Sequence, residues 1–346
     1  MSWNLQHVPA VASAVTMRAI GSYDGLPISD PQSLVDVELP GPELRPRDVL
    51  VRVQAVSVNP VDIKRRASLE HSETPVVLGY DGAGIVEEVG PEVSTLAVGD
   101  EVYYAGDLTR QGSNAELQAV DERIVAYRPG SLSFAEAAAL PLTSITAWET
   151  LFDRFRLDSG STGMLLIVGA AGGVGSVMIQ LAKQLTGLEV LATATRSESR
   201  DWVCALGADR VVDHHDLVDS IRSHGVDEVD YIFSPHSRDN IDAYAEIIRP
   251  FGEITAIDEP EGLDLLALKT KSVAWHWELM FTRSLFETPD MIEQKHLLSR
   301  VARLVDEQRL RTTMTESIDD FSAAGLRRAH ELVESGRMTG KVVVHR

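Results

Sequence analysis

The segment 165–183, LLIVGAAGGVGSVMIQLAK, places four glycines between an apolar, strand-like run and the start of a helical pattern. A helix that begins directly after a strand presents unpaired N–H groups and the positive end of its dipole to whatever lies above the turn. Glycines permit the tight turn and the close approach of a diphosphate. The apolar positions that carry the helical pattern are Val174, Met178, Leu181, Ala182 and Leu185.

The glycine spacing, G-x-x-G-G-x-G, is a variant of the G-x-G-x-x-G fingerprint of dinucleotide-binding turns. A glycine-rich turn without a ligand is the alternative for such a motif on its own. The flanking strand and helix favour dinucleotide binding. We expect the cradle to consist of Gly169, Ala170, Ala171, Gly172, Gly173, Val174 and Gly175.

The chain around this motif alternates between strand and helix patterns. Further strands are predicted at 189–195, 210–213, 229–233 and 252–257, and a helix at 197–207 with Ser197 as its N-cap. Such alternation predicts an α/β fold, a doubly wound parallel sheet of the Rossmann type with helices on both faces.

The first part of the chain is β-like instead, with strict apolar–polar alternation over 49–58. A helix is expected over 290–307, with Thr288 as N-cap and Pro289 at its first position, and another helix near 321–333. The final strand, 340–345, resembles the first part. We therefore expect a mainly-β domain formed by 1–142 plus 309–346, into which a dinucleotide-binding domain, 143–308, is inserted.

The amino-acid composition restricts the classes of partner that the protein can bind. The net charge of −20 over 346 residues argues against binding to nucleic acid or to an anionic membrane surface. No apolar run reaches the length of about 18–20 residues that a bilayer requires. The single cysteine, and a start that lacks the basic region of a signal peptide, agree with a cytoplasmic protein. Whether residues 1–16 belong to the native start is left open.

The residues at the end of the second strand indicate which dinucleotide binds. An NAD site places an acid about 20 residues past the last glycine. Thr195 and Arg196 stand there, and the Arg196 guanidinium suits a 2′-phosphate. We predict that NADPH is preferred to NADH, although Glu198 lies close by and a solvated Arg196 is the alternative.

The chain resembles the medium-chain dehydrogenase/reductase superfamily over nearly its whole length. The resemblance is closest to the quinone oxidoreductase branch and its zinc-type alcohol dehydrogenase-like group. It implies a GroES-like catalytic domain joined to a Rossmann domain, with the nicotinamide in the cleft between them. Besides the glycine motif, the stretches that carry it are VSVNPVDIK (56–64), LGYDGAGIVEEVG (78–90), VGDEVYY (98–104), GSNAE (112–116), LPLTSITAWETL (140–151), WHWELMFTR (275–283) and the ending GKVVV.

The zinc-dependent members of this superfamily hold their metal with a Cys, a His within Gly-His-Glu, and a later Cys or Asp. In this sequence Asn59 or a neighbour stands at the first position, and Gly79-Tyr80-Asp81 replaces Gly-His-Glu. His214 and His215, if they lie in a strand, face opposite ways and chelate poorly. We predict no catalytic zinc.

Without a Lewis acid, hydride transfer suits an electron-poor acceptor whose developing oxyanion hydrogen-bond donors can stabilise. Three residues are candidates for that role. Asn59 follows a strand and, by resemblance, lies near the nicotinamide, unless it only satisfies the turn before Pro60. Lys64 could stabilise an enolate or be a surface charge. Tyr80 could donate a proton or only pack.

Further cofactor contacts are implied by the resemblance. Thr143 and Thr146 would lie near the nicotinamide, although a role in helix capping is the alternative. Phe281 and Thr282 would flank it, and His214 would contact the adenosine phosphate. His236 follows the fourth strand, where ligands of such sheets bind. Trp275 and Trp277 lie in a predicted late strand, and because related enzymes dimerise along such an edge, the resemblance implies a homodimer.

The sequence thus predicts a zinc-independent, NADPH-dependent reductase of quinones or α,β-unsaturated carbonyls. Two alternatives stay open, a zinc alcohol dehydrogenase with unusual ligands and a low-turnover NADPH-binding redox sensor. Neither the acceptor nor the proton donor is specified, because cleft loops such as 64–75 and 104–114 carry no readable code.

Overall fold

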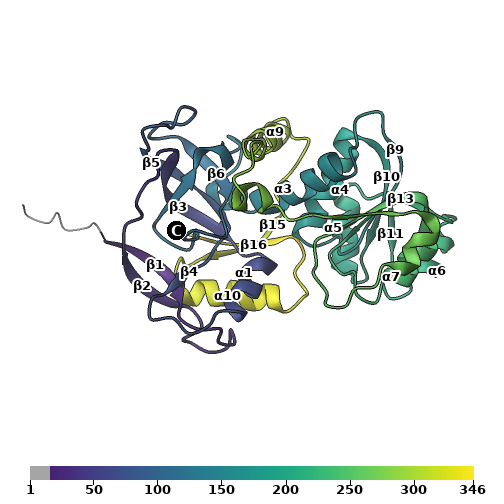
Figure 1. The fold of residues 1–346 in the computed structure, drawn as a ribbon, viewed down its shortest axis with the longest axis horizontal. Helices are drawn as coiled ribbons and strands as arrows, with labels where there is room; N and C mark the ends of the chain where they lie inside the picture. The colour runs from purple at the N-terminus through teal and green to yellow at the C-terminus, as the bar shows by residue number, and fades with distance from the viewer. Residues whose placement is uncertain (1–15) are drawn as a thin grey trace, which may run out of the picture.

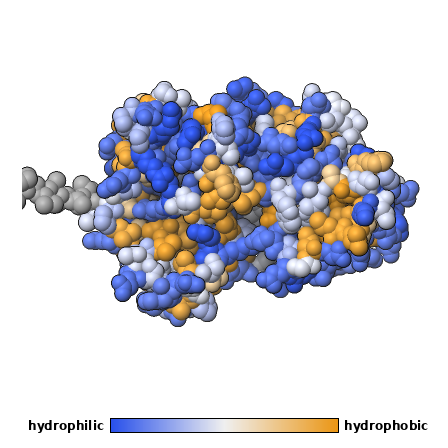
Figure 2. Space-filling view, viewed as in Figure 1, coloured by the Kyte–Doolittle hydropathy of each residue, from blue (hydrophilic) through white to orange (hydrophobic). Residues whose placement is uncertain are grey.

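The computed structural model describes residues 16–346, so the expectation about a signal peptide in the first residues lies outside it. The chain forms two halves side by side (Figure 1), with the purple-to-blue start and the yellow end sharing one half and the teal-to-green middle forming the other. Figure 2 shows that this face is mostly hydrophilic, with hydrophobic residues gathered near the middle and over the second half. Within residues 16–346, no helix combines the length and the apolar character needed to cross a membrane.

The second half is built on a sheet of six strands, all parallel to their neighbours. Their order in the sheet is β11 (Arg210–Val212), β10 (Gly187–Thr193), β9 (Thr162–Ile167), β12 (Val229–Ser234), β13 (Ile248–Ala256) and β14 (Ala274–Trp277). The helices between the strands are α4 (Gly173–Leu185), α5 (Ser197–Leu206), α6 (Leu217–Ser223) and α7 (Ile241–Ile247). This order, with its reversal at the first strand, is that of the Rossmann fold, so the prediction is confirmed.

The first half contains two sheets. The larger one orders β15 (Met314–Asp319), β16 (Lys341–His345), β3 (Asp48–Ser57), β5 (Asp81–Val89), β6 (Glu101–Ala105) and β8 (Val125–Tyr127), while β7 (Leu117–Asp121) pairs with β3. The smaller one joins β2 (Val35–Pro40), β1 (Thr16–Ser22) and β4 (Val76–Val77). The short helices α1 (Pro60–Ala67), η1 (Glu122–Ile124) and α2 (Phe134–Ala138), and the longer α10 (Ala323–Glu334), complete this half.

The last strand of the chain therefore lies beside β3, next to residues from the beginning. The boundaries at 142/143 and 308/309 stay a prediction, because α3 (Pro141–Trp148) packs both on α4 and on β5 and β6. A π-helical turn, η2 (Glu149–Arg154), follows α3. The second half also contains η3 (Leu266–Lys271), and α8 (Thr282–Leu285) follows β14 in the chain. Helix α9 (Glu293–Asp306) packs on α3 and on β8 and η1 of the first half.

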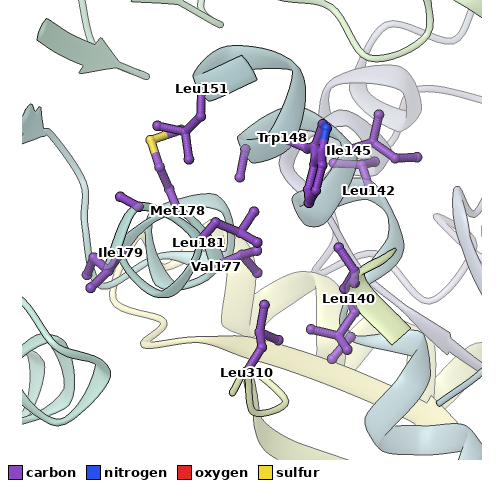
Figure 3. Packing of buried hydrophobic residues seen from close by; sticks show 14 of the residues in the cluster. Leu140, Leu142, Ile145, Trp148, Leu151, Val177, Met178, Ile179, Leu181 and Leu310 are labelled. Atoms are coloured by element: carbon purple, nitrogen blue, oxygen red, sulfur yellow. The ribbon is translucent and has the colours of Figure 1, made fainter. Parts of the chain in front are cut away.

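The core beneath the glycine motif explains why α4 keeps its position. Figure 3 shows side chains of α3 and α4 that point toward one another, and all of them are buried. Removing such side chains from water contributes about 1.5–3 kcal/mol each. The buried residues labelled on these two helices are Leu142, Ile145, Trp148, Val177, Met178, Ile179 and Leu181.

Two local predictions, both of helix starts, are wrong. Ser197 is the first residue of α5, and Arg196 is its N-cap. Helix α9 begins at Glu293, not near Thr288, because the preceding segment forms turns in which the Thr288 N–H donates to the Arg283 carbonyl. Helix α1 was not expected, since its eight residues carry too many charged side chains to show an apolar period.

Candidate active site

The glycine loop joins β9 to α4, and each of three glycines in it is required for a different structural reason. Gly169 has φ +65°, the left-handed region, and its N–H donates to Thr193 Oγ1 at 2.9 Å. A Cβ on Gly175 would lie 2.5 Å from Ala170 Cα, so the helix packs directly on the loop. A Cβ on Gly173 would lie 2.7 Å from Lys341 Cδ and 2.9 Å from Thr143 Cγ2.

The first turn of α4 forms the predicted cradle. The Ser176 N–H makes the first backbone bond of this helix, to Gly172 at 2.9 Å. The N–H groups of Gly173, Val174 and Gly175 therefore have no intrahelical partner and point out of the helix end. Ala170 and Ala171 are buried behind them. This backbone fits a diphosphate.

Arg196 and Thr195 are exposed beyond the end of β10, the place of the adenosine ribose in such folds. The Arg196 guanidinium lies 3.5 Å from the hydroxyl of Thr339, which comes from the far end of the chain. Among residues 16–346, no other hydrogen bond or ion pair holds the guanidinium.

His214 and His236 follow β11 and β12 at the same edge of the sheet. Burial and the charges of His215 and His236 lower the pKa of His214. The expectation that His214 and His215 face opposite ways is wrong, because both lie beyond the strand end, with ring centroids 4.0 Å apart. With Asp213 they form an exposed trio whose ligand atoms lie within 4.8 Å of one another, at the adenosine end of the sheet.

A buried polar group, the Lys341 cluster, lies at the opposite end of the cleft. It consists of Ser57, Asn59, Asp62, Asp81 and Lys341. The Lys341 Nζ donates to Asn59 Oδ1 at 2.5 Å and to the Val58 carbonyl at 2.9 Å, and lies 3.4 Å from Asp81 Oδ2. Burial lowers the pKa of Lys341, and Asp81 and Asp62 oppose that effect. Three acceptors match the three protons of its ammonium.

Asp81 receives donors from three directions. Its Oδ2 accepts from Ser57 Oγ at 2.6 Å and from Asn59 Nδ2 at 2.8 Å, and its Oδ1 accepts from the Leu142 N–H at 2.8 Å. The Asn59 amide is thus held at both ends, by Lys341 and by Asp81. Asn59 is 1% exposed, which suits it to orient other groups.

Asp62, in the first turn of helix α1, has an unusual carboxyl. Its Oδ2 accepts from the Asn59 N–H at 2.7 Å, while its buried Oδ1 has no partner among the described residues. Burial raises the pKa of Asp62 to about 7, with opposing contributions from the Asn59 N–H and Lys341.

Tyr80 and Phe281 meet where the two halves face each other. Their rings are 5.2 Å apart in an edge-on arrangement, and both side chains are buried. Burial and the neighbouring Asp62 raise the pKa of the Tyr80 hydroxyl, which keeps its proton. Thr282 follows as the first residue of α8.

Lys64 lies apart from these residues. It is exposed on α1, and its Nζ makes an ion pair with Glu259 of the second half at 2.9 Å. Thr143 and Thr146 lie within α3 rather than at its cap, and their hydroxyls donate to carbonyls one turn back, Leu140 and Leu142. Thr143 also touches the loop at Gly173. The structure therefore brings Thr143 to the glycine loop and leaves Lys64 at the mouth of the cleft.

A second buried charge group, the Glu149 cluster, lies behind the cleft. It consists of Glu149, Asp153, Arg154, Glu278 and Arg283. Arg154 pairs with Glu278 at 2.8 Å, while Arg283 contacts Glu149 and also pairs with Asp153 at 3.0 Å. Burial and the facing Glu278 carboxyl raise the pKa of Glu149 far above its ordinary range, so that it keeps a proton at neutral pH.

Sequence reasoning missed Lys341, Asp81 and the second cluster as functional candidates. Their partners lie up to 283 positions away, beyond the reach of any local pattern. One signal was present, since Lys341 is a charged residue at the start of the buried run VVV, where a lysine needs a partner.

Comparison with known proteins adds independent information. The family described as alcohol dehydrogenase GroES-like domain matches residues 45–149, and that described as zinc-binding dehydrogenase matches residues 206–344. A zinc-type alcohol dehydrogenase-like protein of Staphylococcus aureus (strain MSSA476) is 42% identical over 86% of this chain and 90% of that protein.

Two further similarities extend these matches. The crystal structure of a putative zinc-dependent alcohol dehydrogenase from Rhizobium etli CFN 42 superposes with a TM-score of 0.91, at 49% identity, over 96% of this chain and 98% of that one. The chloroplastic NADPH-dependent alkenal/one oxidoreductase of Arabidopsis thaliana is 42% identical over 50% of this chain and 46% of that protein.

Proposed function

Because the chain belongs to the medium-chain dehydrogenase/reductase superfamily, and is therefore an oxidoreductase, we propose that it reduces an α,β-unsaturated carbonyl or a quinone with NADPH and without zinc. The observation that carries the proposal is the Lys341 cluster. A lysine ammonium and an amide surround the carboxylate of Asp81, at the position where zinc-dependent members of the superfamily hold their metal.

The donor set at that position does not suit zinc. Zinc prefers thiolate, imidazole and free carboxylate ligands in a tetrahedral arrangement. Asn59 and Tyr80 are poor ligands, and Asp81 already accepts from Ser57, Asn59 and the Leu142 N–H. A divalent cation there would also be repelled by the Lys341 ammonium.

The cofactor preference rests on Arg196. Its exposed guanidinium can form a charge-assisted fork with a 2′-phosphate, and no carboxylate stands in its place at the end of β10 to accept ribose hydroxyls. The glycine loop N–H groups would hold the diphosphate. The name of the Arabidopsis relative, which covers half of this chain, supports NADPH and an enone acceptor.

Bound NADPH supplies the hydride, which goes to the electron-poor β-carbon of the acceptor. The alkene electron pair then forms a double bond between the α-carbon and the carbonyl carbon, and the carbonyl π pair moves onto oxygen to give an enolate. A proton from the protein or solvent at the α-carbon restores the carbonyl and completes the reduction. The Tyr80 hydroxyl keeps its proton at neutral pH, so it can donate a hydrogen bond to that oxygen. Phe281 covers Tyr80 and limits the entry of water.

The test is NADPH consumption against a panel of quinones, enones and aldehydes, with and without a chelator, together with metal analysis of the purified protein. We expect turnover of enones or quinones that the chelator leaves unchanged. Aldehyde turnover lost to the chelator, with near-stoichiometric zinc, would instead favour a zinc alcohol dehydrogenase. Tight NADPH binding without turnover of any acceptor would favour a redox sensor.

The cofactor assignment has its own test in Arg196→Ala. We expect NADPH affinity to fall by about 10- to 100-fold, since a charge-assisted pair is worth roughly 1.5–3 kcal/mol, with NADH affinity unchanged. The matched control is Arg200→Ala, one helical turn further along α5, whose guanidinium donates to the Ala194 carbonyl. Equal binding of both cofactors by the wild type, unaltered in Arg196→Ala, would refute the assignment.

We also propose that the protein is a cytoplasmic homodimer that pairs along β14. This strand is the sheet edge, and Trp277 and Leu279 beside it are about half exposed. Size-exclusion chromatography with light scattering should give a dimer, and Trp277→Asp should give a monomer. A monomeric wild type would contradict this part of the proposal.

A further inference from the structure

The end of the chain is attached to the glycine loop. Gly340 and Gly172 form an isolated parallel bridge, and the Gly340 N–H donates to the Ala171 carbonyl at 2.8 Å. Gly340 has φ +64°, and a Cβ there would lie 2.4 Å from the Thr313 carbonyl oxygen, so only glycine fits. The next residue, Lys341, therefore enters the structure directly beneath the loop.

The Lys341 side chain is fixed at both ends. Its backbone belongs to β16, which pairs with β3, and its Nζ is held by Val58, Asn59 and Asp81. Between these ends, Cδ lies against Gly173. A buried ammonium that lost these acceptors would be strongly destabilised, so the side chain cannot swing away.

Asn59 extends this connection to helix α1. Its Oδ1 accepts from Lys341, its Nδ2 donates to Asp81, and its N–H donates to Asp62 at the start of α1. Because every polar group of the Asn59 amide is engaged, a displacement of Lys341 must displace Asn59. Helix α1 carries Lys64 at the cleft mouth and packs on α10.

We propose that Lys341 is a positioning residue that couples the glycine loop to Asn59, so that the seating of the cofactor diphosphate and the geometry at the reaction end are set together. Gly173 is then required for two reasons, to expose its N–H to the diphosphate and to leave room for the Lys341 stem. The inference rests on the proposed function in one respect, that the loop binds NADPH.

The test is a double-mutant cycle between Gly173→Ala and Lys341→Met. In the wild type the methyl group added by Gly173→Ala would lie 2.7 Å from Lys341 Cδ. Because the Lys341 side chain is held at both ends, the loop or Asn59 must move. In Lys341→Met the end of the side chain is free and can turn aside. The contact of the methyl with Thr143 is the same in both backgrounds and cancels from the cycle.

Two readouts are measured, the NADPH Kd from cofactor fluorescence and turnover at saturating NADPH. In the wild type we expect Gly173→Ala to raise the NADPH Kd and to lower turnover, each at least tenfold. In Lys341→Met both effects should be several-fold smaller, because only the contact with Thr143 remains. Gly172→Ala is the control, because its Cβ would meet only the Gly169 carbonyl oxygen at 3.3 Å. Its effect should be the same in both backgrounds. Independent effects of Gly173→Ala and Lys341→Met would overturn the inference.

If Lys341→Met does not fold, the cycle is run with Asn59→Ala, which breaks the connection one residue further along. The effect of Gly173→Ala on turnover must then shrink in that background, and an undiminished effect overturns the coupling. Failure of the proposed function looks different. A wild type that binds NADPH but reduces no acceptor refutes the proposed function, while the Kd cycle still decides the coupling.

Discussion

The Lys341 cluster and the Glu149 cluster both bury several charged groups, but they balance the charge differently. In the first, one fully enclosed ammonium faces two carboxyls, and every neutralising partner lies inside the protein. In the second, the arginines that neutralise the carboxyls reach toward solvent, with Arg154 36% exposed. Each cluster holds one carboxyl whose pKa burial raises, Asp62 in the first and Glu149 in the second, but only the first balances its charge with a fully enclosed lysine. The predictions below test that difference.

Removing Asp81 should have the largest effect. Asp81→Ala leaves the Lys341 ammonium buried without its carboxylate and removes the acceptor of Ser57, Asn59 and the Leu142 N–H. We expect the free energy of unfolding to fall by about 3–5 kcal/mol in urea denaturation. The control Asp319→Ala, at a side chain 82% exposed, should change it by less than about 0.5 kcal/mol. Similar losses in both variants would contradict the comparison.

The Glu149 cluster should respond to pH. Glu149 keeps its proton when folded but loses it when unfolded, so the folded state binds more protons and stability falls as pH rises. Between pH 5.5 and 7.5 the free energy of unfolding should fall by on the order of 1 kcal/mol per pH unit. Glu149→Gln should remove that part of the slope in urea denaturation, and the exposed control Glu293→Gln should not. A slope unchanged by Glu149→Gln would exclude the retained proton.

Asp62 should also make the protein less stable as pH rises, but over a lower pH range than Glu149. Its pKa is raised to about 7 by burial, so stability falls as pH rises from the ordinary value of Asp toward 7. Between pH 5 and 6 the free energy of unfolding should fall by on the order of 1 kcal/mol, and Asp62→Asn should abolish that fall. Above pH 8 the slope of wild type and variant should coincide. A difference confined to alkaline pH would show that another group titrates.

The smallest effect is expected at Lys64. Its pair with Glu259 joins two exposed side chains, so Lys64→Ala should lower stability by less than about 0.5 kcal/mol. If Lys64 also stabilises an enolate, turnover should fall while Glu259→Ala leaves turnover intact. Equal losses of turnover in the two variants would assign the role to the ion pair that joins the halves.

Much of the fold could be predicted because its signals are local. The alternation over 49–58 gave β3, and the apolar spacing after Gly175 gave α4. The glycine loop was found for the same reason, since its donors are backbone groups of one short segment. The reaction end could not be found this way. Lys341 meets Asn59 only because β16 pairs with β3, and no pattern near either residue contains that pairing.

The misplaced helix starts have a related cause. A capping residue such as Ser197 or Thr288 is a weak local preference, and tertiary contacts moved the boundary by one to several residues. Likewise, His214 and His215 were taken to lie in a strand that ends two residues earlier.

The position of Lys341 also has a consequence for biosynthesis. Asn59 and Asp81 emerge early from the ribosome, but the ammonium that balances Asp81 is the sixth residue from the end of the described chain. Domains fold largely in the order of synthesis. The first half therefore lacks β16 and Lys341 while the entire Rossmann half is made and folds. Closure of the site therefore follows synthesis of the Rossmann half.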